Sequence, residues 1–264
     1  MTFDLLSCRF CLSARQSTRF PQGHAGNVLR GALGIMLRQI ASPEDYARLF
    51  APVSNLPGPS GLADRPRPFV IRAAALDGRT LEPGDSFSFE LNLFDTADLT
   101  LEYFTRAFAQ WAELASVERR PVMVDLCSRP IPVSRIRVEF QTPCELKTSD
   151  GDVGDFAVLL ARARDRVSTL RSLYGAGPLE IDFRAFTERA RSVQTVLHDL
   201  RRVGVERRSS RTGQRHGIGG FIGSAEYVGD LAEFLPYLEA ARWTGVGRHC
   251  TWGNGQIRVE VIHE

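Results

Sequence analysis

Glycine, arginine, histidine and tryptophan are combined in one short stretch near the end of the chain. Residues 245–255 read Gly-Val-Gly-Arg-His-Cys-Thr-Trp-Gly-Asn-Gly. Glycine lets the backbone approach a partner closely and take dihedral angles that other residues avoid. Main-chain N–H groups presented beside a guanidinium suit an extended polyanion. The stretch therefore predicts a polyanion-binding loop, and a tight helix-to-strand connection without a ligand is the simpler alternative. Its candidate binding residues are Gly245, Gly247, Arg248, His249 and Trp252.

A run of arginines lies upstream of this loop. Between residues 201 and 215 there are six arginines and one acidic residue, with serine, threonine and glutamine among them. Arginine gives phosphate both charge and bidentate hydrogen bonds, and the hydroxyl and amide groups add neutral donors. We expect this run to bind phosphates, and a charged edge strand that blocks aggregation is the alternative. The candidate residues are Arg207, Arg208, Arg211, Arg215 and the adjacent His216.

Motifs for nucleotide cofactors, metals and covalent catalysis are absent or incomplete. In the glycine-rich run 216–223, Ile222 replaces the third glycine of a dinucleotide-binding fingerprint. The only lysine, Lys147, lies outside any Walker-type loop, and neither an HExxH nor a GxSxG motif occurs. The five cysteines are scattered, and Cys8 and Cys11 are expected on opposite faces of a strand. The sequence thus predicts no cofactor and no metal site.

Composition places the chain among globular proteins. It has 264 residues, of which 43% are hydrophobic and 24% charged, and its formal net charge of +2 does not by itself indicate a nucleic-acid partner. The preference for arginine over lysine suits phosphate binding, although a GC-rich genome gives the same bias. No segment reaches the roughly 18 apolar residues of a membrane span. The N-terminus does not have the pattern of a signal peptide, so we expect a cytoplasmic protein that does not bind a membrane.

The apolar pattern of the first half predicts a β-α-β-β-α-β unit. A glycine-containing turn at residues 20–27 precedes a helix in which Leu29, Leu33, Met36 and Ile40 recur on one face. The other expected elements are strands at 3–14, 69–75, 86–94 and 121–127 and a helix that starts near Asp98. The proline-rich residues 51–68 are expected to form an irregular loop.

The same order of elements restarts after two prolines, Pro130 and Pro132. The expected elements are a strand at 136–140, helices at 156–174 and 182–200, strands near 203–211 and 219–229, a helix at 231–243 and a strand from Ile257. Apart from one extra helix, this is the order of a ferredoxin-like unit. We therefore expect an α+β fold of two tandem ferredoxin-like domains, residues 1–130 and 131–264.

Four segments of the chain together resemble one protein family. They are GNVLRGALG at 26–34, FQTP at 140–143, GGFIG at 219–223 and the paired glycines of 245–255. In this order and spacing the chain resembles the CRISPR-associated endoribonucleases that process precursor CRISPR RNA, which belong to the repeat-associated mysterious protein (RAMP) superfamily. Those proteins have tandem ferredoxin-like domains and a glycine-rich loop before the last strand. The last loop departs from their pattern, so that Arg248 and Trp252 would take the places of the basic and aromatic residues that often flank the glycines.

The resemblance implies a metal-independent endoribonuclease that cuts within each CRISPR repeat. A ribose 2′-OH attacks the adjacent phosphate and leaves a 2′,3′-cyclic phosphate or 3′-phosphate and a 5′-OH. This reaction needs a base, an acid and cations that stabilise the developing charge. The family commonly keeps its catalytic histidine in the turn before the first helix, where His24 stands. On that helix Arg30 would stabilise the transition state, and Arg38 would bind RNA.

The remaining four histidines differ in what the sequence predicts for them. His216 and His249 lie in the two expected binding loops and could instead supply the acid or a base contact. His198 is expected inside an amphipathic helix, and His263 lies next to the end of the sequence. The leading catalytic candidate is His24, in the domain that spans residues 1–130.

The resemblance also names partners and leaves two rival functions. The expected partner is CRISPR repeat RNA, as precursor and as mature guide, and subunits of a CRISPR effector complex are further candidates. Whether the chain forms a homodimer is left open by the sequence. One rival is a RAMP subunit that holds guide RNA without cutting it. The other is a two-domain protein that binds a small anionic ligand in the same loops.

The arginine run yields a first prediction. Arg208→Ala or Arg211→Ala should weaken binding of repeat RNA and make the slope of log affinity against log salt shallower by about one. The reason is that RNA bound with one phosphate contact fewer releases fewer counterions. The measurement is a set of RNA affinities across a salt series. A slope equal to that of the parent protein would show that these residues do not contact phosphate.

Overall fold

The computed structural model of the protein describes residues 1–52, 65–146, 154–204, 206–208, 215–217 and 219–263. Of residues 206–208, 215 and 216 only the backbone is described. Most of the irregular loop expected at 51–68 lies outside the described residues. No helix in the described ranges combines the length and the apolar character needed to cross a bilayer.

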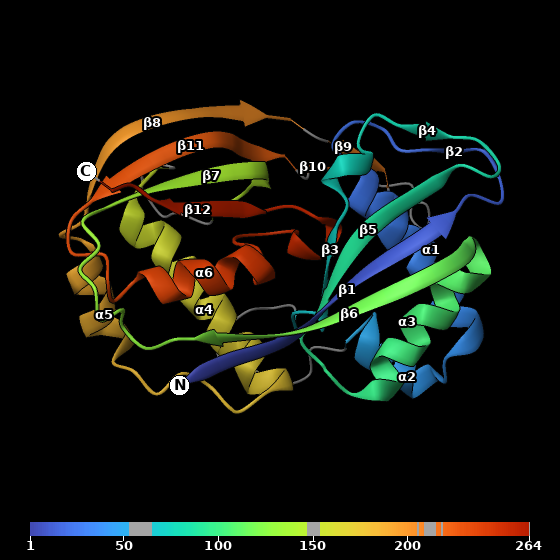
Figure 1. Ribbon diagram of the computed structural model, residues 1–264, viewed down its shortest axis with the longest axis horizontal. Coiled ribbons are helices and arrows are strands. Elements are labelled where there is room, and N and C mark those ends of the chain that lie inside the picture. Colours follow the sequence, from blue (N-terminus) through green and yellow to red (C-terminus); the bar gives the residue numbers. More distant parts are fainter. Residues whose placement is uncertain (53–64, 147–153, 205, 209–214, 218, 264) are drawn as a thin grey trace.

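The first half of the chain forms a four-stranded antiparallel sheet with two helices on one face (Figure 1). Its main elements are β1 (Thr2–Ser13), α1 (Ala25–Ile40), β3 (Phe69–Arg72), β5 (Ser86–Leu93), α3 (Asp98–Trp111) and β6 (Glu113–Asp125). The strand order is β3-β5-β1-β6, in which the first and third strands of the unit are neighbours at the centre. Short elements decorate this unit, namely β2 (Thr18–Arg19), α2 (Pro43–Leu49), the 3-10 helix η1 (Ala74–Leu76) and β4 (Thr80–Leu81).

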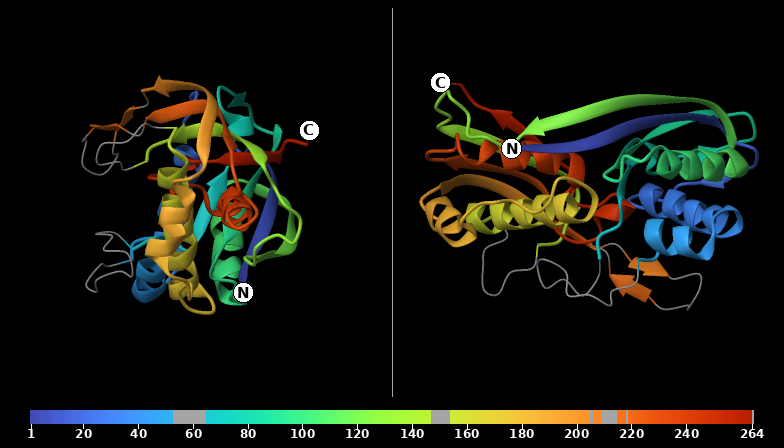
Figure 2. Two further views of the ribbon diagram at one scale, coloured as in Figure 1. Left: turned by 90° about the vertical axis from the view of Figure 1, so that its left-hand side faces the viewer. Right: turned by 90° about the horizontal axis from the view of Figure 1, so that it is seen from below.

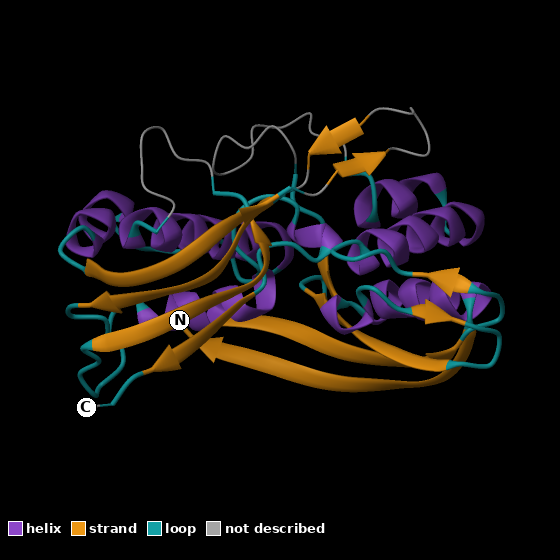
Figure 3. Ribbon diagram, turned by 90° about the horizontal axis from the view of Figure 1, so that it is seen from above, coloured by secondary structure: helices purple, strands orange, loops and turns teal. Residues whose placement is uncertain are grey.

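The second half repeats this arrangement. Its elements are β7 (Arg135–Cys144), α4 (Phe156–Tyr174), α5 (Phe183–Ala190), β8 (Gln194–Val203), β9 (Glu206–Arg208), β10 (Arg215–Gly217), β11 (Gly220–Val228), α6 (Leu235–Thr244), the 3-10 helix η2 (Cys250–Trp252) and β12 (Ile257–Val261). The sheet order is β12-β7-β11-β8, again with the first and third strands at the centre. The expected fold class, two tandem ferredoxin-like units, is confirmed. Figure 3 shows the two sheets side by side, each with helices packed against it.

The chain after α5 differs from the sequence prediction. We expected a helix over 182–200, but α5 ends at Ala190 and residues 194–203 form β8, which pairs with β11 at the edge of the sheet. The apolar side chains here are spaced as on a helix. On the edge strand Val196 and Leu197 are both exposed, so the alternation that marks a half-buried strand is missing. His198 therefore lies on an exposed strand rather than in a helix.

The expected strand near 203–211 is also interrupted. The strand of the sheet ends at Val203, and β9 forms a separate hairpin with β10. In this hairpin Arg208 lies opposite Arg215, and Arg207 lies opposite His216. The basic run is thus divided between the end of the sheet and the hairpin.

The long strand β1 contributes side chains to two hydrophobic cores, one in each half of the chain. Phe10 and Leu12 are buried with the residues of α1 and α3, whereas Phe3 and Leu5 are buried with the core of the second half. Because side chains alternate along a strand, these two pairs leave opposite faces of β1. Strand β6 pairs with β1 along its whole length and adds Val124 to the core of the second half. Figure 2 shows both strands extending from the first sheet toward α6.

The C-terminal end of α6 is fixed by side chains from outside the helix. The last carbonyl groups of a helix have no partner within it. Here the carbonyls of residues 242–244 accept hydrogen bonds from Arg72 of β3, from Asn92 Nδ2 of β5 (2.9 Å) and from Arg166 Nε of α4 (2.8 Å). Burial lowers the pKa of Arg72 to about 10. Two of these donors belong to the first sheet, so the start of the 245–255 loop is held against the first half of the molecule.

Helix α1 touches that loop through a glycine. A Cβ placed on Gly26 would lie 2.3 Å from the carbonyl oxygen of Trp252, well inside any real contact. On the same helix Leu29, Leu33 and Leu37 are fully buried, and Met36 and Ile40 of the expected face are partly buried against the same core. The apolar face of α1 therefore packs on its own sheet while its first turn meets the loop of the other half.

This packing gives a prediction with a matched control on the same helix. Gly26→Ala should lower the free energy of unfolding by about 1–3 kcal/mol, because the new methyl group forces α1 away from the loop. Gly31→Ala, where a Cβ has open space around it, should raise the free energy of unfolding by about 0.5–1 kcal/mol through helix propensity. Denaturant unfolding of both variants measures the difference. If both changes stabilised the protein alike, the contact with Trp252 would not exist in solution.

Candidate functional site

The turn that carries His24 is held at the N-terminus of α1. His24 is the N-cap residue, but its side chain makes no capping hydrogen bond. That place is taken by Asp77, which follows η1 and whose Oδ1 accepts from the N–H of Ala25 at 2.8 Å. Burial raises the pKa of the Asp77 carboxyl, while the nearby N–H groups of residues 23–25 favour its charged form. The imidazole of His24 is half-buried and is therefore partly accessible to a ligand.

The 245–255 loop has a backbone that few residues other than glycine adopt. Positive φ angles occur at Gly245 (71°), Gly247 (82°), His249 (62°), Gly253 (90°) and Gly255 (69°). His249 is the exception, since a side chain in the left-handed region is uncommon and marks a position fixed by its surroundings. At Gly247 and Gly255 a Cβ would lie 2.4 Å and 2.0 Å from main-chain carbonyl oxygens. Glycine at these positions lets the loop fold tightly against its neighbours.

Those neighbours are the last residues of β7, which form the FQTP segment and its continuation. The Thr142 hydroxyl donates to the carbonyl of Gly253 and accepts from the N–H of Gln256, both at 2.9 Å. The N–H of Gly255 donates to the carbonyl of Pro143 at 2.9 Å. Two motifs that lie far apart in the sequence thus form one structural unit.

A stack of four side chains connects α2, α1 and the loop. The guanidinium of Arg30 lies 4.5 Å from the ring centroid of Phe50 and 5.4 Å from that of Trp252. The Trp252 ring in turn stacks on His249, with centroids 4.6 Å apart and an interplanar angle of 7°. Arg30 is only 8% exposed, so its charge lies behind the loop rather than at its surface. The stack fixes the direction of the His249 ring.

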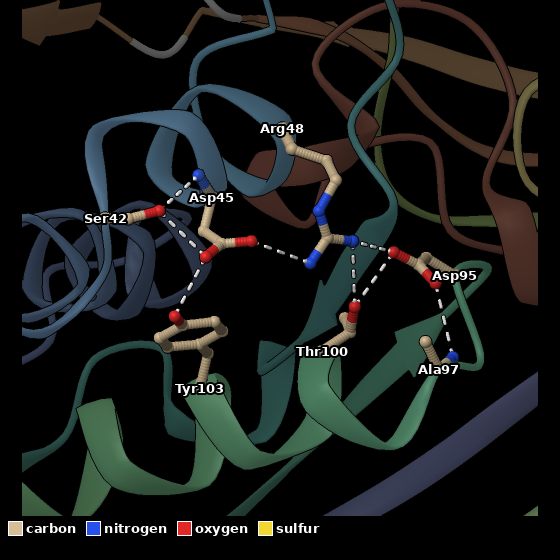
Figure 4. A network of polar contacts seen from close by, with 7 residues as sticks. All are labelled: Ser42, Asp45, Arg48, Asp95, Ala97, Thr100 and Tyr103. Carbon is tan, nitrogen blue, oxygen red and sulfur yellow. Dashed lines mark hydrogen bonds and ion pairs between the residues drawn. The ribbon is translucent and has the colours of Figure 1, made fainter.

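Phe50 follows α2, and a network of polar contacts fixes α2 against α3 (Figure 4). Ser42 caps α2 by accepting from the N–H of Asp45, and Asp45 accepts from the hydroxyl of Tyr103 at 2.9 Å. Arg48 pairs with Asp95 after β5. The Ser42 hydroxyl also donates to Asp45 Oδ2 at 2.8 Å, and this hydrogen bond first, followed by that from Tyr103, keeps the pKa of Asp45 below its ordinary value. By fixing α2, the network also fixes the position of the Phe50 ring against the Arg30 guanidinium.

Glu145, directly after β7, pairs with both basic residues of the loop. Its Oε1 lies 3.0 Å from Arg248 NH1, and its Oε2 lies 3.5 Å from His249 Nε2. Its main-chain carbonyl also accepts from the N–H of Arg248 at 3.0 Å. The sequence analysis did not single out Glu145. A useful signal was its position just after the FQTP segment, two residues from the only lysine.

A groove of about 250 Å³ separates the exposed faces of the two sheets beside α6. Its basic lining residues are Arg72, Arg120, Arg242 and Arg258. Arg120 lies 5.0 Å from the ring centroid of Trp243, a geometry that attracts a cation to an aromatic face. The groove continues into a second one of about 440 Å³ over the C-terminal sheet, lined by Arg137 and Arg201 among others. Sequence patterns missed these arginines, except Arg201, because they lie singly on different strands and, for Arg242, on α6.

The other predicted residues are distributed as follows. Arg38 is exposed in the last turn of α1, 5.5 Å from the ring centroid of Tyr46 and far along the helix from the His24 turn. Arg211 lies outside the described residues, as do the side chains of Arg207, Arg208, Arg215 and His216. The structure thus brings Gly26 and Arg30 of α1 against Trp252, which stacks on His249, and His24 stands two residues before Gly26. In the described part of the chain, no cluster of three or more His, Cys, Asp or Glu side chains could hold a metal ion.

Comparison with known proteins agrees with this architecture. Residues 138–257 match a family model described as CRISPR-associated endoribonuclease Cas6, and residues 3–125 match one described as an N-terminal domain. No curated protein matches the chain. Among solved structures, a Cas6 product complex has a TM-score of 0.65 and 16% identity, with 98% of this chain and 99% of that chain covered.

Two further structures have the same fold. Cas6 of Thermus thermophilus has a TM-score of 0.61 and 17% identity over 98% of this chain and 99% of that one. A partial Cas6-RT-Cas1–Cas2 complex has a TM-score of 0.61 and 13% identity over 98% of this chain and 46% of that one. Residues 138–257, somewhat less than half of the chain, thus resemble the Cas6 endoribonucleases in sequence, and the whole chain shares the fold of the solved Cas6 structures.

The Asp77 cap gives a prediction for the His24 turn. Asp77→Ala should lower the free energy of unfolding by about 0.5–2 kcal/mol, because the N–H groups of the turn lose their acceptor. Asp77→Asn should keep that acceptor and be at least as stable as the parent protein at pH 7. The sign follows from the raised pKa: the folded protein binds this proton more tightly than the unfolded chain, so the parent loses stability as the pH rises above 3.8.

The check is denaturant unfolding at pH 7 and at a pH near 3.8. The advantage of Asp77→Asn over the parent should be present at pH 7 and fade as the pH falls to that value. An Asp77→Asn variant as unstable as Asp77→Ala would mean that the carboxylate charge, rather than its hydrogen bonds, holds the turn.

Proposed function

We propose that this protein cleaves CRISPR repeat RNA without a metal ion, at the junction of the His24 turn and the 245–255 loop. The observation that carries the proposal is the main-chain contact between Gly26 and Trp252. It joins a turn with a partly accessible histidine to the loop that carries Arg248, an exposed cation. The description of the matching family as an endoribonuclease supports the reaction class, and the Cas6 product complex of the same fold supports RNA as the ligand.

The reaction follows from the groups at this junction. His24 accepts the proton of a ribose 2′-OH, whose oxygen then attacks the adjacent phosphorus. The bond from phosphorus to the 5′ oxygen breaks, and that oxygen takes up a proton from a second group, for which His249 and His216 are the candidates. The products are a 2′,3′-cyclic phosphate, or the 3′-phosphate after hydrolysis, and a 5′-OH.

Stabilisation of the developing negative charge falls to the loop. Arg248 is 58% exposed and can reach a phosphate. The N–H groups of Gly245, Gly253 and Gly255 already donate to main-chain carbonyls, so the arginine rather than these amides meets the phosphate. Arg30 acts from behind Trp252, adding positive charge and holding the loop in place. The arginines of the β9–β10 hairpin and of the groove between the sheets add phosphate contacts that position the repeat.

Protein partners follow from the larger assembly in which a similar unit occurs. The partial Cas6-RT-Cas1–Cas2 complex contains a region with this fold. We propose that other CRISPR proteins receive the processed RNA from this chain.

The assignment of His24 is tested by substitution. His24→Ala should slow single-turnover cleavage of a repeat RNA by roughly 10²–10⁴-fold, because general acid–base catalysis is lost. RNA affinity should stay close to that of the parent, since the loop cations are intact. His263→Ala, which removes an exposed histidine near the end of the chain, is the control and should cleave normally.

Two outcomes would change the proposal. Full activity in His24→Ala would move the catalytic role to His216 or His249. Cleavage by the parent protein is also measured in EDTA, with the RNA ends analysed for a cyclic phosphate. Loss of cleavage in EDTA would contradict a metal-independent reaction, and binding without any cleavage would identify a subunit that only holds guide RNA.

A further inference from the structure

The carboxylate of Glu145 lies between the side chains of Arg248 and His249 of the glycine loop. One oxygen is 3.0 Å from Arg248 NH1 and the other is 3.5 Å from His249 Nε2. A carboxylate in this position uses two acceptor oxygens on two separate donors, as the two non-bridging oxygens of a phosphodiester would. The loop side chains therefore form an anion site that an internal side chain fills.

The backbone of Arg248 and the ring of His249 are held at this site by constraints that do not depend on the Glu145 carboxylate. The N–H of Arg248 donates to the main-chain carbonyl of residue 145, which any side chain at that position would retain. His249 is held in the left-handed region and is stacked on Trp252, so its ring edge has a fixed direction. The site would consequently keep its shape when the carboxylate leaves.

The carboxylate is also free to leave. The side chains of Arg248, Glu145 and His249 are 58%, 37% and 24% exposed, so solvent screens the ion pairs and the pairs are weak. Glu145 directly follows the last residue of β7, and its long side chain can rotate to solvent without moving the strand. A phosphate that arrives with other RNA contacts can take its place.

We infer that Arg248 and His249 bind one backbone phosphate of the RNA, and that Glu145 occupies this subsite in the free protein and competes with the phosphate. The inference rests on the proposed RNA-binding function. It assigns the negatively charged Glu145 a role within the positively charged RNA-binding site. Competition by Glu145 lowers the affinity for any ligand that offers only one phosphate. An RNA that contacts the rest of the basic surface displaces the carboxylate, so the subsite favours extended RNA over isolated anions.

The test is binding of a repeat RNA that carries a 2′-deoxy substitution at the cleavage position, so that binding is measured without cleavage. Glu145→Gln removes the competing charge and keeps the shape of the side chain. It should bind this RNA about threefold to fivefold more tightly than the parent at low salt, the range of a surface ion pair. Glu145→Ala should change the affinity in the same direction. Thermal melting of each variant verifies that it is folded.

Glu188→Gln on α5 is the matched control. Glu188 is also an exposed carboxylate paired with an arginine, Arg191, at 2.8 Å, but it lies on a helix that contributes no proposed RNA contact. Its substitution should leave the RNA affinity unchanged. An equal gain in Glu188→Gln and Glu145→Gln would mean that only the net charge of the protein matters, and the inference would fail.

A double-substitution cycle separates competition at this subsite from a general effect. Arg248→Ala should weaken binding and reduce the salt slope by about one. In the Arg248→Ala background, most of the gain from Glu145→Gln should disappear, because the carboxylate no longer has its main partner to block. A full gain in that background, or unchanged or weaker binding by folded Glu145→Gln, overturns the inference. Cleavage of unmodified RNA by the parent protein tests the proposed function separately, so the two can fail independently.

Discussion

Main-chain contact between α1 and the 245–255 loop is the constraint on which the proposed site depends. The two segments approach so closely at Gly26 that a single Cβ would collide with the carbonyl of Trp252. One segment belongs to the first sheet unit and the other to the second. The His24 turn and the loop cations are therefore neighbours only when both units are folded and docked, which makes the site a property of the whole chain.

Docking of the two units is itself well determined. Strand β1 buries one face in each hydrophobic core, so neither core is complete without it. The C-terminal carbonyls of α6 are satisfied partly by Arg72 and Asn92 of the first sheet, and an unsatisfied buried carbonyl would be costly. Since the glycine loop begins where α6 ends, these hydrogen bonds also set the starting point of the loop.

The arginine side chains at the site have aromatic or acidic partners: Arg30 packs against Phe50 and Trp252, and Arg248 pairs with Glu145. The Ser42–Asp45–Arg48 network holds α2, α2 presents Phe50, and Phe50 supports Arg30 beneath Trp252 (Figure 4). Arg248 and His249 meet Glu145 instead. Arg30 is thereby given a positioning role, whereas Arg248 and His249 remain close to solvent. The distinction between a buried and an exposed cation decides which of them can meet RNA directly.

The sequence alone predicted the fold class and most of the elements, and four short motifs, three of which contain glycine, indicated the resemblance to CRISPR endoribonucleases. Helical spacing in α1 and α4 and strict alternation in β5 and β12 are local patterns that remain in the folded protein. The sequence could not place residues 194–203, because the exposed apolar residues of this edge strand have helical spacing and only pairing with β11 makes the segment a strand. Nor could it reveal Asp77 and Glu145, whose roles depend on contacts with α1 and with the loop across long separations in the chain. Local periodicity depends only on residues that are close in the sequence. The site depends on distant segments that pack together, which bury Arg30, cap the His24 turn and place Glu145 against Arg248.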